Sequence, residues 1–112
     1  MIRKVFYYKN YFENFIENQN LKVKRKIFWV IDVIENERII PETYFKLIKD
    51  GIYEIRVQCG NNIFRILCFF DSNKLVILMN GFQKKTQKTP VKEVELAIKI
   101  RKEYENEKSN ID

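Results

Sequence analysis

Histidine is absent from the 112-residue chain. The side chain that most often transfers protons near pH 7 is therefore missing, which excludes the Ser-His-Asp and Cys-His catalytic arrangements. The two cysteines, Cys59 and Cys68, supply too few soft ligands for a metal site, and we expect neither a metal nor another cofactor. Any catalysis by this chain has to use Lys, Arg, Tyr, Glu or Asp.

Glycine and proline are also scarce, with three and two residues, while 46% of the chain is hydrophobic. This balance is typical of a folded domain and not of a disordered segment. The length allows one domain over residues 1–112, of which about 105–112 form a charged tail. No apolar run is long enough to span a bilayer, and the N-terminus lacks the pattern of a signal peptide. We therefore expect a cytoplasmic protein without membrane contact.

Positive charges exceed negative charges by six, and they are unevenly distributed. Residues 82–92 contain no acidic residue and four lysines, namely Lys84, Lys85, Lys88 and Lys92. A second basic cluster comprises Lys22, Lys24, Arg25 and Lys26. This second cluster is interpreted as a solvated helix end, with a contact to rRNA or to a partner as the alternative. Basic surfaces attract polyanions, so the charge favours a nucleic-acid partner.

The hydrophobic pattern predicts an α+β fold with the order strand, two helices, three strands, helix. The predicted strands cover residues 2–8, 52–58, 63–70 and 75–82, and the predicted helices cover residues 11–18, 21–35 and about 91–104. Residues 42–49 are compatible with a short additional helix. Thr89 is predicted to cap the last helix, with Pro90 at its first position. The last three strands form an antiparallel meander, and the helices are expected to cover one face of the sheet.

The two turns of the meander predict the pairing of its strands. The first turn, around Gly60, places Arg56 opposite Arg65, and the second places Arg65 opposite Asn80. These three polar side chains then form a row across one face of the sheet, with Gln58 beside them. The other face is almost wholly apolar, as expected for a face that packs on helices.

Two arginines that face each other across a sheet repel one another. Either Glu54 or a bound phosphate would relieve this repulsion, since the forked donors of arginine match both anions. If the last strand continues past Phe82, Lys84 lies on the same face as the arginines. Phosphate contacts beside an aromatic ring are typical of RNA binding. The alternative interpretation is a solvated strand face, neutralised by Glu54 and followed by a solvated loop.

Three segments carry a resemblance to a known family: YEIRV at residues 53–57, FRIL at 64–67 and LMNGFQKKTQKTP at 78–90. They resemble the HigB branch of the RelE/ParE superfamily of toxins, which includes phage-derived members. The resemblance extends over residues 5–104. It implies a RelE-like fold, which agrees with the order of elements predicted from the pattern.

The resemblance further implies the toxin of a type II toxin–antitoxin system. Such a toxin enters the ribosomal A site and inhibits translation by cleaving mRNA, without metal, through attack of the 2′-hydroxyl on the neighbouring phosphate. The residues predicted to be catalytic are Arg56, Arg65, Lys84 and Lys85. The residues predicted to contact RNA are Gln58, Asn80, Phe82, Thr86 and Lys88. Many relatives carry histidine at the position of Asn80, so we expect a lysine to exchange the proton here.

The partners implied by the resemblance are mRNA on the ribosome, with rRNA contacts, and a HigA-like antitoxin that contains a helix-turn-helix domain. Residues 12–34 and the last helix are candidate contacts for the antitoxin. Two other functions share the fold: a ParE-like toxin that inhibits gyrase, and a non-catalytic module that binds RNA or protein. Intact mRNA in arrested cells would indicate the first alternative, and harmless overexpression would indicate the second.

Overall fold

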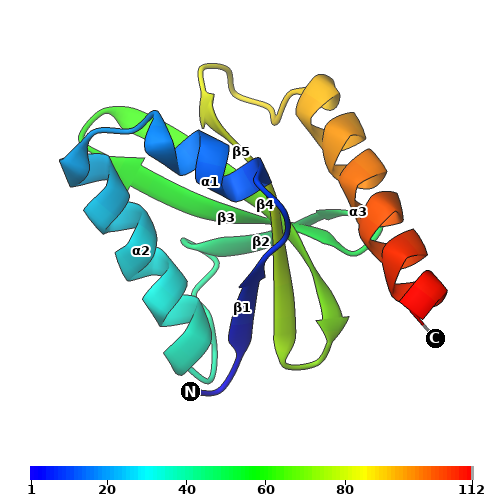
Figure 1. The fold of residues 1–112 in the computed structure, drawn as a ribbon. Coiled ribbons are helices and arrows are strands. Elements are labelled where there is room, and N and C mark those ends of the chain that lie inside the picture. Colours follow the sequence, from blue (N-terminus) through cyan, green and yellow to red (C-terminus); the bar gives the residue numbers. More distant parts are fainter. Residues whose placement is uncertain (112) are drawn as a thin grey trace.

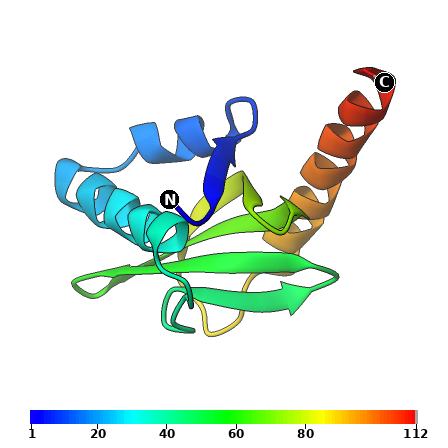
Figure 2. The same ribbon diagram turned by 90° about the horizontal axis from the view of Figure 1, so that it is seen from below.

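The computed structural model describes residues 1–111 and confirms the α+β class. Five strands form one mixed sheet in the order β1-β5-β4-β3-β2 (Figures 1 and 2). The strands are β1 (Lys4–Tyr7), β2 (Phe45–Lys49), β3 (Ile52–Cys59), β4 (Asn62–Ser72) and β5 (Leu75–Lys84). The helices are α1 (Tyr11–Glu17), α2 (Leu21–Asn36) and α3 (Val91–Ile111). The predicted order of elements is confirmed except for β2, an additional strand, and the fold is compatible with a RelE-like fold.

Strands β3, β4 and β5 form the predicted antiparallel meander, and β1 joins β5 as a parallel edge strand. The α1–α2 hairpin begins its second helix at Asn20, whose side-chain oxygen accepts a hydrogen bond from the amide of Val23 at 2.9 Å. This contact satisfies one of the amides that a helix start leaves without a partner. The helix α2 therefore begins directly after Asn20, at Leu21.

Helices cover both faces of the sheet, whereas the sequence led us to expect them on one face only. The hairpin lies on one side of β4 and β5, and α3 lies on the other (Figure 1). One core cluster includes Ile27 and Ile34 of α2, and the second includes Ile100 of α3. Because helices cover both faces, the central strands are largely apolar on both, and the buried polar residues Glu54, Arg65 and Asn80 are the exceptions.

The short helix predicted over residues 42–49 is wrong, because most of this segment is strand β2. Phe45 stacks on Tyr53 of β3, with ring centroids 4.7 Å apart and planes at 12°, and pairs with Ile55 in the ladder. This cross-strand contact is a tertiary interaction that outweighs a weak local preference for helix. The strand extends the sheet beyond β3.

The final helix is longer than predicted, since α3 continues through Ile111 and not to about Tyr104. Contacts with β4 hold this extension: the hydroxyl of Tyr104 and the amine of Lys108 both donate to the carboxylate of Asp71, at 2.8 and 2.7 Å. The predicted charged tail is therefore helical up to residue 111, and residue 112 lies outside the described residues. Within residues 1–111, no helix combines the length and apolar character needed to cross a membrane.

Candidate functional site

Arg56 of β3 and Arg65 of β4 lie directly opposite each other, which confirms the predicted pairing. Glu54, two residues before Arg56 on the same face, is buried between them. Its Oε2 atom lies 3.3 Å from Nε of Arg56 and 3.6 Å from Nε of Arg65. Its Oε1 atom accepts a hydrogen bond of 2.8 Å from the hydroxyl of Thr89. Glu54 therefore relieves the repulsion, and the group of three side chains retains one net positive charge.

Arg65 is buried, with 7% of its surface exposed. Burial lowers the pKa of its guanidinium, while Glu54 opposes this shift and Arg56 adds to it. Its Nη1 atom donates to the carbonyl of Phe64 at 3.1 Å, but its Nε atom has no hydrogen-bond partner among the described residues. This Nε atom faces the carboxylate of Glu54, so Glu54 is the anion nearest to it among the described residues.

The pairing of β4 with β5 differs from the prediction: Arg65 faces Phe82, not Asn80. The second turn is centred one residue later than predicted, because Ser72 pairs with Leu75, and two register shifts follow along β4. At the shift after Ile66, Met79 and Asn80 together oppose a single residue of β4. A bulge of this kind changes the pairing of every residue beyond it.

Asn80 is buried, with 5% of its surface exposed, and lies against α3. Its side-chain nitrogen donates to the carbonyl of Glu93 at 3.1 Å and to the Glu93 carboxylate at 3.0 Å. The structure therefore places Asn80 where it orients α3, away from the open surface where RNA contact was predicted. Phe82 is partly buried and packs against the core beneath the same helix.

Lys84 ends β5 opposite Ile63, next to the arginine pair. Burial lowers the pKa of its amine, and the positive charge of Arg65 lowers it further. Glu54 opposes this shift, whereas Arg56 and Lys46 add to it. Lys84 is therefore closer to its neutral form than an ordinary lysine, and a neutral amine can accept a proton.

A hollow of about 540 Å³ joins Lys84 to Arg56 of the arginine pair. We call it the lysine hollow. Its lining residues are Arg56, Ile63, Lys84, Lys85, Thr86 and Gln87. Lys85 and Thr86 are exposed, and the Thr86 hydroxyl donates to the carbonyl of Lys88 at 2.9 Å. Lys88 is exposed and is not among the lining residues.

The loop before α3 is attached to the site through Thr89. Thr89 was predicted to cap α3, but its hydroxyl donates to Glu54, and the helix starts instead with the amide of Val94 bonded to the carbonyl of Pro90 at 3.3 Å. The prediction of a cap is therefore wrong. Thr89 and Glu54 are far apart in the sequence, so no sequence motif could have predicted the contact between them.

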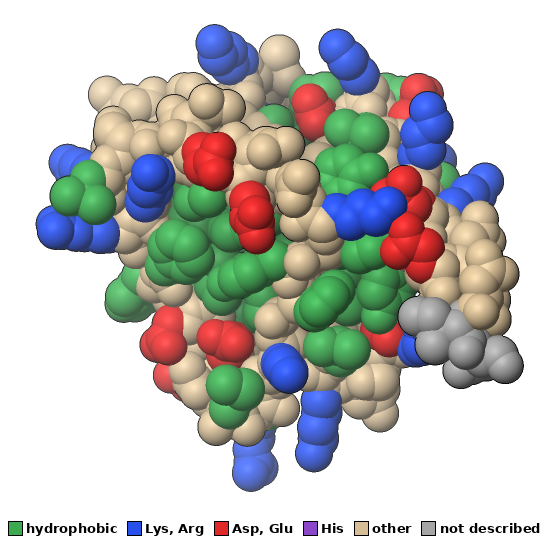
Figure 3. Space-filling view, viewed as in Figure 1, with side chains coloured by type: hydrophobic (Ala, Val, Ile, Leu, Met, Phe, Trp, Pro, Cys, Tyr) green, Lys and Arg blue, Asp and Glu red, His purple; other side chains and the backbone are tan. Residues whose placement is uncertain are grey.

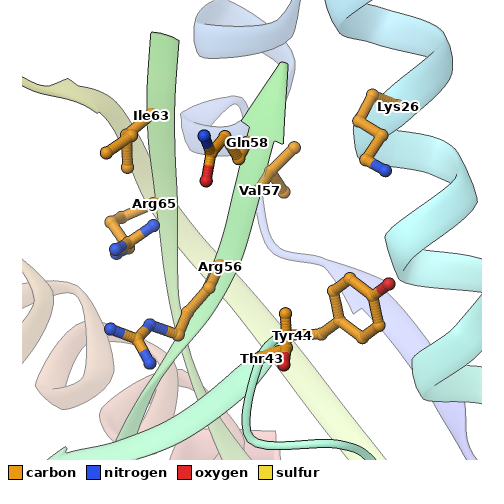
Figure 4. Close-up of a pocket in the computed structure, with 8 residues that line it drawn as sticks. All are labelled: Lys26, Thr43, Tyr44, Arg56, Val57, Gln58, Ile63 and Arg65. Atoms are coloured by element: carbon orange, nitrogen blue, oxygen red, sulfur yellow. The ribbon is translucent and has the colours of Figure 1, made fainter. Parts of the chain in front are cut away.

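A second cavity, of about 350 Å³, lies on the other side of the arginine pair. We call it the edge notch. Figure 4 shows Arg56 and Arg65 on one side of β3 and Lys26 and Tyr44 on the other. The exposed side chain of Gln58 also lines it and donates to the carbonyl of Gly60 at 3.2 Å. The sequence analysis missed Tyr44, because residues 42–49 were interpreted as a helix and not as the approach to an edge strand.

The fold and the basic surface define an α+β protein compatible with the RelE-like class. Residues 14–102 match the family model described as phage derived protein Gp49-like (DUF891). Because the match covers most of the chain, the protein belongs to this phage-derived Gp49-like family. A comparison with curated proteins finds no match. The family agrees with the phage-derived part of the resemblance found in the sequence.

Proposed function

We propose that this protein is the toxin of a type II toxin–antitoxin system and that it inhibits translation by cleaving mRNA on the ribosome without a metal. One observation carries the proposal: Arg56 and Lys84 line an open hollow, Arg65 lies opposite Arg56, and burial together with Arg65 lowers the pKa of Lys84. Phosphate binding next to a group that exchanges protons is what RNA cleavage requires. Membership of the phage-derived Gp49-like family, which is of the toxin-like RelE/HigB type, supports the same conclusion.

In the proposed reaction, the 2′-hydroxyl of RNA attacks the neighbouring phosphate and the bond to the 5′-oxygen breaks. The products are a 2′,3′-cyclic phosphate, or a 3′-phosphate after hydrolysis, and a 5′-hydroxyl. A base accepts the proton of the 2′-hydroxyl, and an acid returns a proton to the 5′-oxygen. Lys84 is the candidate for one of these two roles because burial and the neighbouring arginines lower the pKa of its amine.

Arg56 and Arg65 would stabilise the negative charge that develops on the phosphate in the transition state. Their positions are held by Glu54, whose two carboxylate oxygens contact both arginines and Thr89. Lys85 would add positive charge at the rim of the lysine hollow. Asn80 would act indirectly, because its contacts with Glu93 hold α3 in place.

The proposed protein partner is a helix-turn-helix antitoxin of the HigA type. Exposed aromatic side chains support a protein contact on β1 and α2: Phe6 and Phe28 are each 44% exposed and Tyr7 is 39% exposed. Figure 3 shows hydrophobic side chains gathered on the face that includes α1, α2 and β1. Exposed apolar clusters of this kind often mark protein interfaces.

Expression of Lys84→Ala and Arg65→Ala variants in cells tests the proposal. Both variants should lose toxicity and mRNA cleavage, whereas Lys102→Ala, an exposed lysine of α3, should keep both. Thermal unfolding separates loss of chemistry from loss of the fold, which matters most for the buried Arg65. Full toxicity in both variants would refute the site assignment. Growth arrest with intact mRNA would instead favour gyrase inhibition, and harmless wild-type protein would favour a non-catalytic module.

A further inference from the structure

Strand β3 extends beyond the end of its neighbour β2. The ladder between them reaches the pair Phe45 and Ile55, and one further bond joins the amide of Arg56 to the carbonyl of Tyr44 at 2.8 Å. β3 itself continues to Cys59. The edge notch lies at this step, so it opens both toward the arginine pair and toward α2.

The edge notch is suited to an anion with an aromatic part. Of the residues that line it, three are cationic and none is acidic: Lys26, Arg56 and Arg65 carry the charge. Tyr44 lines the same cavity and packs edge-on against Trp29, with ring centroids 5.5 Å apart. The Nζ atom of Lys26 lies 4.8 Å from the centroid of the Trp29 ring, which is half exposed.

The edge notch and the lysine hollow share Arg56 and Ile63 in their linings. They therefore adjoin each other at Arg56 and Ile63, with the lysine loop on one side and α2 on the other. A chain of phosphates bound at the arginines would continue into the notch at one end. The volume of about 350 Å³ is within the range of cavities that hold a small ligand.

We propose that the edge notch is a nucleotide subsite, in which Tyr44 stacks on a base and Lys26 contacts the adjoining phosphate. The inference rests on the proposed function, because it extends the path of RNA away from the cleaved phosphate. A peptide strand is the less suitable occupant, since β3 extends only a few residues beyond its paired segment and offers a short edge for strand addition. Cations beside a partly exposed aromatic ring, here Tyr44, instead match the recognition of single-stranded nucleic acid.

The single tryptophan of the chain provides a direct measurement, because Trp29 contacts both residues assigned to the subsite. The probe is a short single-stranded oligodeoxynucleotide, which has no 2′-hydroxyl and is not cleaved. Its addition should change the fluorescence of Trp29 as Lys26 moves from the indole to a phosphate. Anisotropy of the labelled oligonucleotide gives the affinity at several salt concentrations.

Three variants separate the contributions. Lys26→Ala should weaken binding about threefold to fivefold at low salt and reduce the salt slope by about 1, the signature of one lost phosphate contact. Tyr44→Leu should weaken binding about tenfold, whereas Tyr44→Phe, which keeps the ring, should bind as the wild type does. Lys102→Ala is the matched control for charge, and its affinity should stay within twofold of wild type.

The outcomes distinguish the subsite from the proposed function. If Arg65→Ala weakens binding but Lys26→Ala and Tyr44→Leu do not, the subsite is refuted and the cleavage site stands. If the oligonucleotide leaves Trp29 fluorescence unchanged, or if polyglutamate binds more tightly, the subsite is refuted in favour of another occupant. Toxicity lost in Lys84→Ala together with normal binding of the oligonucleotide would confirm that binding and cleavage are separable.

Discussion

Replacing Glu54 with glutamine tests the electrostatic arrangement of the site. Glu54 is 3% exposed and is the anion that lies between Arg56 and Arg65. In Glu54→Gln the side-chain oxygen can still accept the hydrogen bond from Thr89, but the new amide then points its donors at two guanidinium groups. The substitution therefore preserves shape and removes the charge that compensates both arginines.

The expected loss of stability follows from burial. Removing one partner of a buried ion pair costs about 3 to 5 kcal/mol, and the partial exposure of Arg56 places the expected value near the lower figure, about 3 kcal/mol. For a domain of this size such a loss lowers the unfolding temperature by roughly 10 to 20 °C. Glu95→Gln, at an exposed position of α3, is the control and should change stability by no more than about 0.5 kcal/mol.

The same variant should respond more strongly to phosphate than the wild type. With Glu54 neutral, the two arginines keep their full positive charge, and a bound phosphate takes the place of the missing carboxylate. Because a ligand of the folded state stabilises it, millimolar phosphate at constant ionic strength should raise the unfolding temperature of Glu54→Gln more than that of the wild type. Equal unfolding temperatures for variant and wild type, or an equal response to phosphate, would refute the role assigned to Glu54.

Three further predictions concern other parts of the structure. Gly81→Ala should destabilise the protein by about 1 to 3 kcal/mol in chemical denaturation, because an added Cβ would lie 2.5 Å from the ring of Phe15; unchanged stability would contradict this packing. Thr89→Val should lower stability by about 1 kcal/mol and reduce cleavage, because the hydrogen bond to Glu54 is lost. Thr89→Ser, which keeps the hydroxyl, should retain wild-type stability and cleavage, and equal behaviour of the two variants would count against a positioning role for Thr89. If Lys84 is the base, the cleavage rate should rise with pH, because the neutral amine is the active form. The rate should level off below the ordinary lysine pKa of 10.5, because the pKa of Lys84 is lowered. A rate independent of pH would argue against Lys84 as the base.

The effect of Lys84 on stability has a sign that can be checked independently. Its lowered pKa means that the folded state binds its proton less tightly than the unfolded state does. The positive form therefore costs stability, and this cost is relieved as pH rises from the lowered pKa toward 10.5. Lys84→Met should lack this pH-dependent gain in urea denaturation, and its persistence in the variant would assign it to another group.

The sequence was sufficient for the features that depend on local patterns. Hydrophobic runs bounded by turn-forming residues located β3, β4 and β5, and helical spacing of apolar residues located α1, α2 and α3. The tight turn at Gly60, which has a φ of +61°, fixed the pairing of Arg56 with Arg65. A hairpin turn specifies the register of the strands it joins, so this pairing could be predicted without the fold.

The tertiary structure decided the features that depend on contacts between distant segments. The late turn between β4 and β5 and the bulge at Met79 and Asn80 together placed Phe82 opposite Arg65, and the sequence pattern does not reveal an extra residue in a strand. Strand β2 exists because Phe45 finds Tyr53, and a segment of five residues has too weak a preference of its own.

The arginine pair also shows which features the sequence determined and which depended on the tertiary structure. The sequence placed two arginines face to face and required a negative charge near them, since like charges across a sheet repel. Only the folded chain showed that Glu54 supplies this charge from a buried position, where Thr89 from the loop before α3 holds its second oxygen. Which charges meet is a matter of residue spacing, but how fully they compensate depends on burial and on partners that the fold brings from elsewhere in the chain.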